Sequence, residues 1–217
     1  RKRSAFYYIN LGIKKSTKPW VVVVNDDMSF DKNWYPEFLN LVSDQNNSNV
    51  GMIIAAMHLG KVKHGRRIIK LGWTKKSGQD QKDLYLADLA FLKREAIEKV
   101  GYYDEKIDWG GGGADLALAI EFLSDTDTIT SDKIKIDHFI VKENRNTNIT
   151  HGFTGFHYVI NKWNKWCKAN NCQYLWNVKI KPYTLKNRLQ DYLLNKARVV
   201  RHYLRYLTGY YQKGSRY

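Results

Sequence analysis

The sequence has few cysteines and no long apolar run. Cys167 and Cys172 are its only cysteines among 217 residues, too few for a disulfide framework or a four-ligand zinc site. We therefore expect two free thiols in a reducing compartment. The longest apolar runs, at residues 20–24 and 52–57, are far shorter than the roughly 20 residues that cross a bilayer. Neither run is therefore long enough to form a transmembrane helix.

Acidic residues are scarce relative to basic ones. The 36 Lys and Arg against 21 Asp and Glu leave a formal net charge of +15, which favours polyanionic partners such as nucleic acid, anionic lipid headgroups or phosphorylated small molecules. Hydrophobic residues make up 43% and charged residues 26%, so disordered and low-complexity classes are excluded. Aromatic residues reach 14%, a content that suits stacking on sugars, bases or an interface.

Strand and helix patterns alternate through residues 1–150 and predict an α/β domain with a mostly parallel sheet flanked by helices. We expect Asp31 to cap one helix and Gly101 to end another, and we expect a hairpin or long loop over 58–81. The predicted strands are 20–24, 51–57, 84–92 and 134–138, and the predicted helices are 33–42, 93–100 and 115–123.

The character of the chain changes after about residue 150. We predict a second part over 151–217, helical, basic and rich in aromatic residues, which ends in an amphipathic basic helix over 184–217. Two roles stay open for that helix. It either contacts an anionic membrane surface peripherally or packs against the first part with its charges solvated.

Asn25, Asp26 and Asp27 follow the apolar run WVVVV at 20–24. Ligands of open α/β sheets bind beyond the carboxyl ends of the strands, so these side chains stand where chemistry is expected. Neighbouring carboxylates repel each other, and Mg²⁺ or Mn²⁺ would neutralise them through oxygen ligands. The alternative is an Asx turn or a cap that leads into the next helix.

Four consecutive glycines lie between Trp109 and Asp115. Such a run suits a loop whose backbone approaches a ligand or moves, and Asp115 then sits at the positive end of the following helix as an ionised carboxylate able to act as a general base. Trp109 is a candidate stacking platform for a sugar. The alternative is a flexible linker with Asp115 as a simple cap and Trp109 in the core.

Several ordered motifs together resemble glycosyltransferase family 2 and related enzymes of the GT-A fold. The resemblance covers roughly residues 10–138 and implies a GT-A-type domain. The motifs are Asn10-Leu11-Gly12, WVVVVNDD at 20–27, KREA at 93–96, VGYYDE at 100–105, GGGGADL at 110–116 and IKIDHF at 134–139.

The resemblance implies a divalent metal, Mn²⁺ or Mg²⁺, that bridges the diphosphate of a nucleotide-sugar donor. Asp27 is then the direct metal ligand, and Asp26 faces the donor ribose or the metal. Asn25 and Asn10 join Asp26 in the donor-binding set. A late histidine completes the metal shell; His138 matches best, and His151 is the alternative.

The family's catalytic base belongs to a Glu-Asp pair at the start of the helix after the glycine-rich loop. This sequence departs from that pattern, because only Asp115 remains. We predict Asp115 as the base, with Asp108 and Glu105 as fallbacks. The acceptor site is predicted at Trp109, Gly111 and Gly112.

The resemblance thus predicts an inverting hexosyl- or deoxyhexosyltransferase that acts on a glycan or lipid-linked acceptor. Only 25 residues precede Asp26, fewer than the nucleotide-binding elements of the family need, and residue 1 is Arg with no signal peptide after it. We therefore expect a segment of a longer protein, cytoplasmic and peripheral on a membrane surface. The alternative is a non-catalytic module that binds glycans or, less in keeping with the motifs, nucleic acid.

Overall fold

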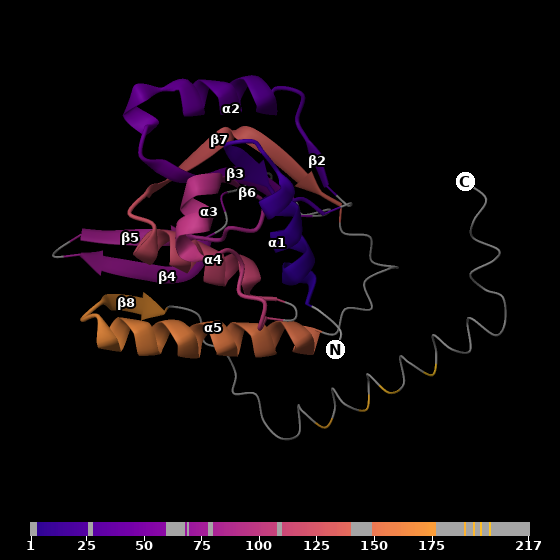
Figure 1. Ribbon diagram of the computed structural model, residues 1–217, viewed down its shortest axis with the longest axis vertical. Coiled ribbons are helices and arrows are strands. Elements are labelled where there is room, and N and C mark those ends of the chain that lie inside the picture. Colours follow the sequence, from indigo (N-terminus) through magenta and orange to yellow (C-terminus); the bar gives the residue numbers. More distant parts are fainter. Residues whose placement is uncertain are drawn as a thin grey trace.

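The computed structural model describes residues 4–25, 28–59, 68, 70–77, 80–107, 110–139 and 149–176, with four single positions between 189 and 200. Within these ranges two sheets and five α-helices form a layered α/β structure (Figure 1). No helix in the described ranges combines the length and the apolar character that a membrane span needs.

A five-stranded sheet forms the centre of the structure, in the order β1-β6-β3-β7-β2. Its long central strand β3 runs parallel to β7, and the other three pairs are antiparallel. The predicted mostly parallel pairing therefore differs from the structure, because an apolar run reports the burial of a strand and not its direction. The strands are β1 (Trp20–Val22), β2 (Met28–Phe30), β3 (Val50–Leu59), β6 (Ala90–Lys93) and β7 (Asp127–His138).

A smaller antiparallel sheet has the order β5-β4-β8. It comprises β4 (Lys70–Ser77), β5 (Asp80–Tyr85) and β8 (Gln173–Trp176). The β4–β5 pair confirms a hairpin within the segment predicted as hairpin or loop. The predicted single strand over 84–92 is wrong: Leu89 adopts a positive φ of 69°, and the resulting turn separates β5 from β6.

The described helices are α1 (Ala5–Lys15), α2 (Trp34–Ser43), α3 (Arg94–Val100), α4 (Gly112–Leu123) and α5 (Ile149–Ala169), with a short 3₁₀ turn, η1 (Gln45–Asn47). The three helices predicted with bounds, at 33–42, 93–100 and 115–123, begin and end within a few residues of the observed α2, α3 and α4. Gly101 ends α3 in the left-handed conformation, as predicted. The cap of α2 is Asn33 and not Asp31; the carboxylate of Asp31 instead accepts a hydrogen bond from the Asn33 backbone N–H.

The core lies on both faces of the large sheet, with α2 on one side and α3 and α4 on the other (Figure 1). Neighbouring residues of β3 show why: Met52 belongs to the cluster beneath α3 and α4, and Ile53 to the cluster beneath α2. Successive side chains of a strand point to opposite faces. Val159 and Trp163 of α5 belong to the cluster beneath α3 and α4. The predicted division of the chain at residue 150 stays a prediction.

Candidate functional site

Strand pairing places His138 beside the stretch that follows the predicted metal-binding acids. On the antiparallel β2–β7 pair, Met28 is opposite His138, and Met28 is the residue after Asp27 in the sequence. The last residue of β3, Leu59, is the parallel partner of His138 on its other side. The ends of three strands therefore meet at His138.

The predicted metal ligands are described only in part. Asp26, Asp27, Asp108 and Trp109 lie outside the described residues, and so does the side chain of His151. Asn25 is exposed. Within the described part of the chain, no group of three or more His, Cys, Asp or Glu side chains could hold a metal ion, and the metal centre stays a prediction.

The glycine run closes tightly around the start of α4. Gly111 precedes the helix with a positive φ of 80°. A Cβ atom on Gly112 would lie 2.0 Å from the ring of Phe6, and one on Gly113 would lie 1.8 Å from Oδ1 of Asp88. Contacts this short exclude any larger residue without a shift of the neighbours, so these glycines serve close packing.

Asp88 comes close to the first turn of α4 from the turn between β5 and β6. The residue as a whole is exposed, yet desolvation of its carboxyl by the surrounding protein raises the pKa of Asp88, and the charge of His138 opposes this rise. Tyr103 is buried, and its burial first and the charge of Asp88 second raise its pKa. Asp88 therefore shares one electrostatic environment with His138.

Asp115, the predicted base, lies in the first turn of α4 with 2% of its surface exposed. Its carboxylate accepts hydrogen bonds from Nε1 of Trp163 and from Nζ of Lys162, both at 2.8 Å. Burial raises the pKa of Asp115 even though these two donors act in the opposite direction. The structure thus ties this carboxylate to α5.

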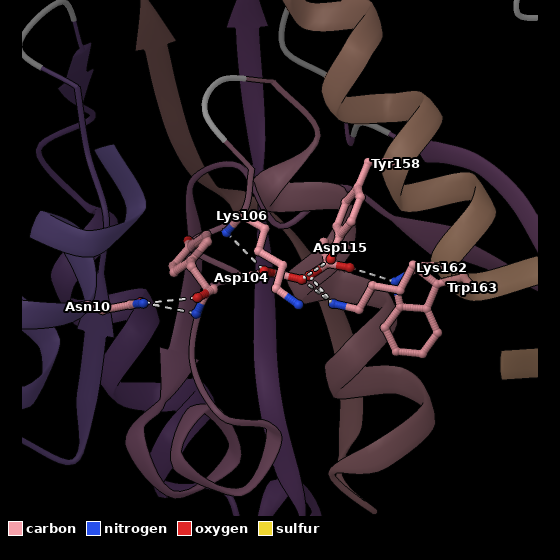
Figure 2. A network of polar contacts seen from close by, with 8 residues as sticks. Asn10, Asp104, Lys106, Asp115, Tyr158, Lys162 and Trp163 are labelled. Atoms are coloured by element: carbon pink, nitrogen blue, oxygen red, sulfur yellow. Dashed lines mark hydrogen bonds and ion pairs between the residues drawn. The ribbon is translucent and has the colours of Figure 1, made fainter. Parts of the chain in front are cut away.

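Lys162 lies between Asp115 and a second carboxylate, Asp104 (Figure 2). Asp104 accepts hydrogen bonds from Lys162 at 3.0 Å, from the Tyr158 hydroxyl at 2.8 Å and from the Lys106 backbone N–H at 3.0 Å. Partial burial works to raise the pKa of Asp104, but these donors outweigh it and the pKa lies below its usual value. One lysine therefore holds both ends of the segment 104–115.

Asn10, predicted to contact the donor, is buried, and its amide links α1 to the loop after α3. Its Nδ2 donates to the Tyr103 carbonyl at 2.9 Å and to Glu105 at 3.0 Å, and its Oδ1 accepts from the Tyr103 backbone N–H at 3.0 Å. These contacts give Asn10 a structural role. Asn10 and Glu105 also line a surface pocket of about 350 Å³, together with Lys14 and Lys162.

The sequence patterns did not indicate Asp88, Tyr158 or Lys162 as site residues. Asp88 carried no signal, since a lone acid in a turn is common. Tyr158 and Lys162 are four residues apart on α5 and so share one helix face. That spacing could have drawn attention to them, although their partners depend on the tertiary fold.

No protein-family model matches the chain, and no curated protein sequence matches it. Solved structures do share its fold. The mannosyltransferase PcManGT from Pyrobaculum calidifontis, in complex with GDP-Man and Mn²⁺, superposes with a TM-score of 0.51 at 14% identity, over 76% of this chain and 45% of that one. GalNAc-T7 with UDP, GalNAc and Mn²⁺ gives a TM-score of 0.53 at 11% identity, over 80% of this chain and 42% of that one.

This likeness shows a GT-A glycosyltransferase-like fold, which confirms the predicted fold class. The chain spans less than half the length of either structure.

Proposed function

We propose that the chain carries part of the active centre of a metal-dependent glycosyltransferase. In the proposed reaction, a sugar moves with inversion from a nucleoside diphosphate to a hydroxyl of a glycan or lipid-linked acceptor. The observation that carries this proposal is the strand register that brings His138 beside the residue after Asp27, within a sheet of the GT-A type. The sugar that we propose to be transferred is a hexosyl or deoxyhexosyl group.

The residues at this place suit a divalent metal. Asp26 and Asp27 would supply carboxylates, and the pairing of Met28 with His138 supports an imidazole as a further ligand. Carboxylates suit Mg²⁺ and Mn²⁺ alike, whereas imidazole suits transition metals, so Mn²⁺ is the better match. A bound metal would offset the charge that builds on the leaving diphosphate. Asn25 is proposed to contact the nucleotide-sugar donor.

Two carboxylates near the start of α4 are candidates for the general base. The base takes the proton of the acceptor hydroxyl while its oxygen bonds to the anomeric carbon and the bond to the diphosphate oxygen breaks on the opposite face. Asp115 is the residue predicted from the sequence, but Lys162 and Trp163 already occupy its oxygens. Asp88 is in contact with solvent, which favours it as the group that meets an acceptor.

The remaining roles extend the same proposal. Trp109, Gly111 and Gly112 are the proposed acceptor-binding residues. A peripheral membrane contact of the C-terminal helix is supported by Leu189, Leu193 and Val200, which are helical and 57–60% exposed. We accordingly propose a cytoplasmic location at a membrane surface, with residues 151–217 as an extension of the catalytic part.

The donor site is tested by calorimetric titration with UDP, GDP and dTDP, each with Mn²⁺ and with EDTA. We expect one nucleotide to bind in the presence of Mn²⁺ only, and we expect Asp27→Ala to abolish this binding and His138→Ala to weaken it. Asp132→Ala is the matched control, because Asp132 is an exposed acid elsewhere on β7. If a folded chain with its natural N-terminus binds none of the three, the transferase proposal is wrong.

The base is identified by comparing Asp88→Asn with Asp115→Asn. Loss of a general base lowers turnover by about 10²- to 10⁴-fold and leaves nucleotide binding intact. We expect this pattern for Asp88→Asn, measured as release of the nucleoside diphosphate with a panel of saccharide acceptors. Full turnover in Asp88→Asn together with a selective loss in Asp115→Asn would return the role to Asp115.

A further inference from the structure

The two cysteines occupy matched positions in the turn that ends α5. The backbone N–H of Cys172 donates to the carbonyl of Cys167 at 2.9 Å, and Asn171 between them has a positive φ of 50°. A hydrogen bond from the sixth residue of a turn back to the first, with a left-handed residue directly before the donor, is typical of a Schellman motif. Side chains at the two ends of this motif commonly contact each other, and here both of them are thiols.

The thiol sulfurs of Cys167 and Cys172 are 2.9 Å apart. No disulfide joins the two cysteines in the structure. A disulfide joins sulfurs at about 2.05 Å, so bond formation needs an approach of less than an ångström. Cys167 is buried with 3% of its surface exposed, whereas Cys172 is partly exposed. A reagent from solvent therefore reaches Cys172 first.

We propose that Cys167 and Cys172 form an oxidisable dithiol site whose substrates are low-molecular-weight disulfides such as glutathione disulfide. The Cys172 thiolate attacks one glutathione sulfur, and one glutathione leaves. The Cys167 thiolate then attacks the Cys172 sulfur and displaces the second glutathione. The two protein sulfurs lose two electrons, glutathione disulfide gains them, and the two cysteine protons end on the two glutathione thiols.

The disulfide would tie the end of α5 to the start of β8. Cys172 directly precedes β8 (Gln173–Trp176), which pairs with β4 through Trp73 and Trp176. Oxidation would therefore fix the junction between the helix that binds Asp115 and the small sheet. This inference is independent of the proposed transferase activity.

Incubation of the folded chain with glutathione disulfide, followed by intact mass and maleimide labelling, tests the proposal. We expect a mass loss of two hydrogen atoms, disappearance of both thiols when the treated chain is unfolded before maleimide labelling, and full reversal by dithiothreitol. The readout is unambiguous because the chain holds only two cysteines. A stable glutathione adduct on the wild-type chain, a disulfide-linked dimer, or an unchanged mass would each overturn the proposal.

Single variants separate the two steps. Cys167→Ser should retain one glutathione on Cys172, because the displacing thiol is gone, and Cys172→Ser should stay unmodified, because Cys167 is buried. Asn171→Gly keeps a residue suited to positive φ and should form the disulfide as the wild type does. Asn171→Val puts a β-branched residue where φ is positive and should slow it. Equal rates in these two variants would contradict the role of the turn.

Discussion

At the scale of single residues, Lys162 organises the candidate site. It pairs with Asp115 and Asp104, and burial lowers its pKa less than these two carboxylates raise it, so the pKa lies above the usual 10.5. A group whose pKa is higher in the folded state than in the unfolded state stabilises the fold. This stabilisation is complete at any pH below the unfolded-state pKa, and it is lost as the pH rises through the folded-state pKa. The stabilisation by Lys162 should therefore persist up to about pH 10.5 and fall beyond it.

Lys162→Met should lower the free energy of unfolding at pH 8 by about 1–3 kcal/mol, because two carboxylates lose a charged donor. The difference from the wild type should shrink above pH 10.5. Urea unfolding at a series of pH values measures both effects. Lys99→Met is the control, since Lys99 forms an exposed pair with Asp125, a kind worth roughly 0–1 kcal/mol. A difference independent of pH would show that the charge of Lys162 is not the cause.

Residue chemistry was predictable only where it follows from local sequence. The acid at the start of α4 and the histidine at the end of β7 stand next to recognisable glycine and strand patterns, so Asp115 and His138 could be selected. Lys162 and Asp104 are 58 positions apart. Their contact depends on how α5 packs, and no sequence spacing reports that. Asp88 was not predicted as a site residue for the same reason, since only the folded chain brings it close to Gly113.

At the scale of elements, the side-chain amide of Asn10 ties α1 to the loop after α3. Asn10 uses both polar atoms of its side chain on the Tyr103 backbone, so Asn10→Ala would leave a buried N–H and a buried carbonyl unpaired, at about 1–3 kcal/mol for each group. We expect a lower urea midpoint. Asn40→Ala, on the exposed face of α2, should change stability by less than about 0.5 kcal/mol. Equal effects of the two variants would mean that the Asn10 contacts do not hold α1.

The elements themselves were largely predictable from periodicity. The helices α2, α3 and α4 follow apolar spacing and were found within a few residues. Strand direction was not predictable in this way: β6 and β3 are both apolar, and their antiparallel pairing depends on the tertiary fold. The strand β8 was not predicted because its neighbour β4 lies about one hundred residues earlier in the sequence: Trp73 of β4 pairs with Trp176 of β8.

At the scale of the whole molecule, the net charge of +15 gives affinity for polyanions that is separate from any donor site. Binding to a mixed-sequence DNA duplex should be detectable at low salt, fall steeply as salt is added because counterions are released, and ignore Mn²⁺. Fluorescence anisotropy at several salt concentrations measures this. Tight DNA binding that persists at physiological salt, without Mn²⁺-dependent nucleotide binding, would favour the nucleic-acid-binding alternative.

The fold class could be predicted for the whole molecule because several motifs occur in a fixed order. The order of apolar runs, glycines and acids narrows the fold more than any one motif does. Which strands make up each sheet could not be predicted, since the second sheet joins β4 and β5 to β8, which lies far along the chain.

The link between α1 and the loop after α3 also bears on how the chain is made. Asn10 and Tyr103 are 93 residues apart, so during synthesis at about 5–20 residues per second the helix waits roughly 5–20 seconds for its partner. Throughout that interval Phe6 of α1 lacks the ring of Tyr103, on which it stacks in the folded protein. Until Tyr103 is made, this apolar ring of α1 stays open to other partners, such as a ribosome-associated chaperone.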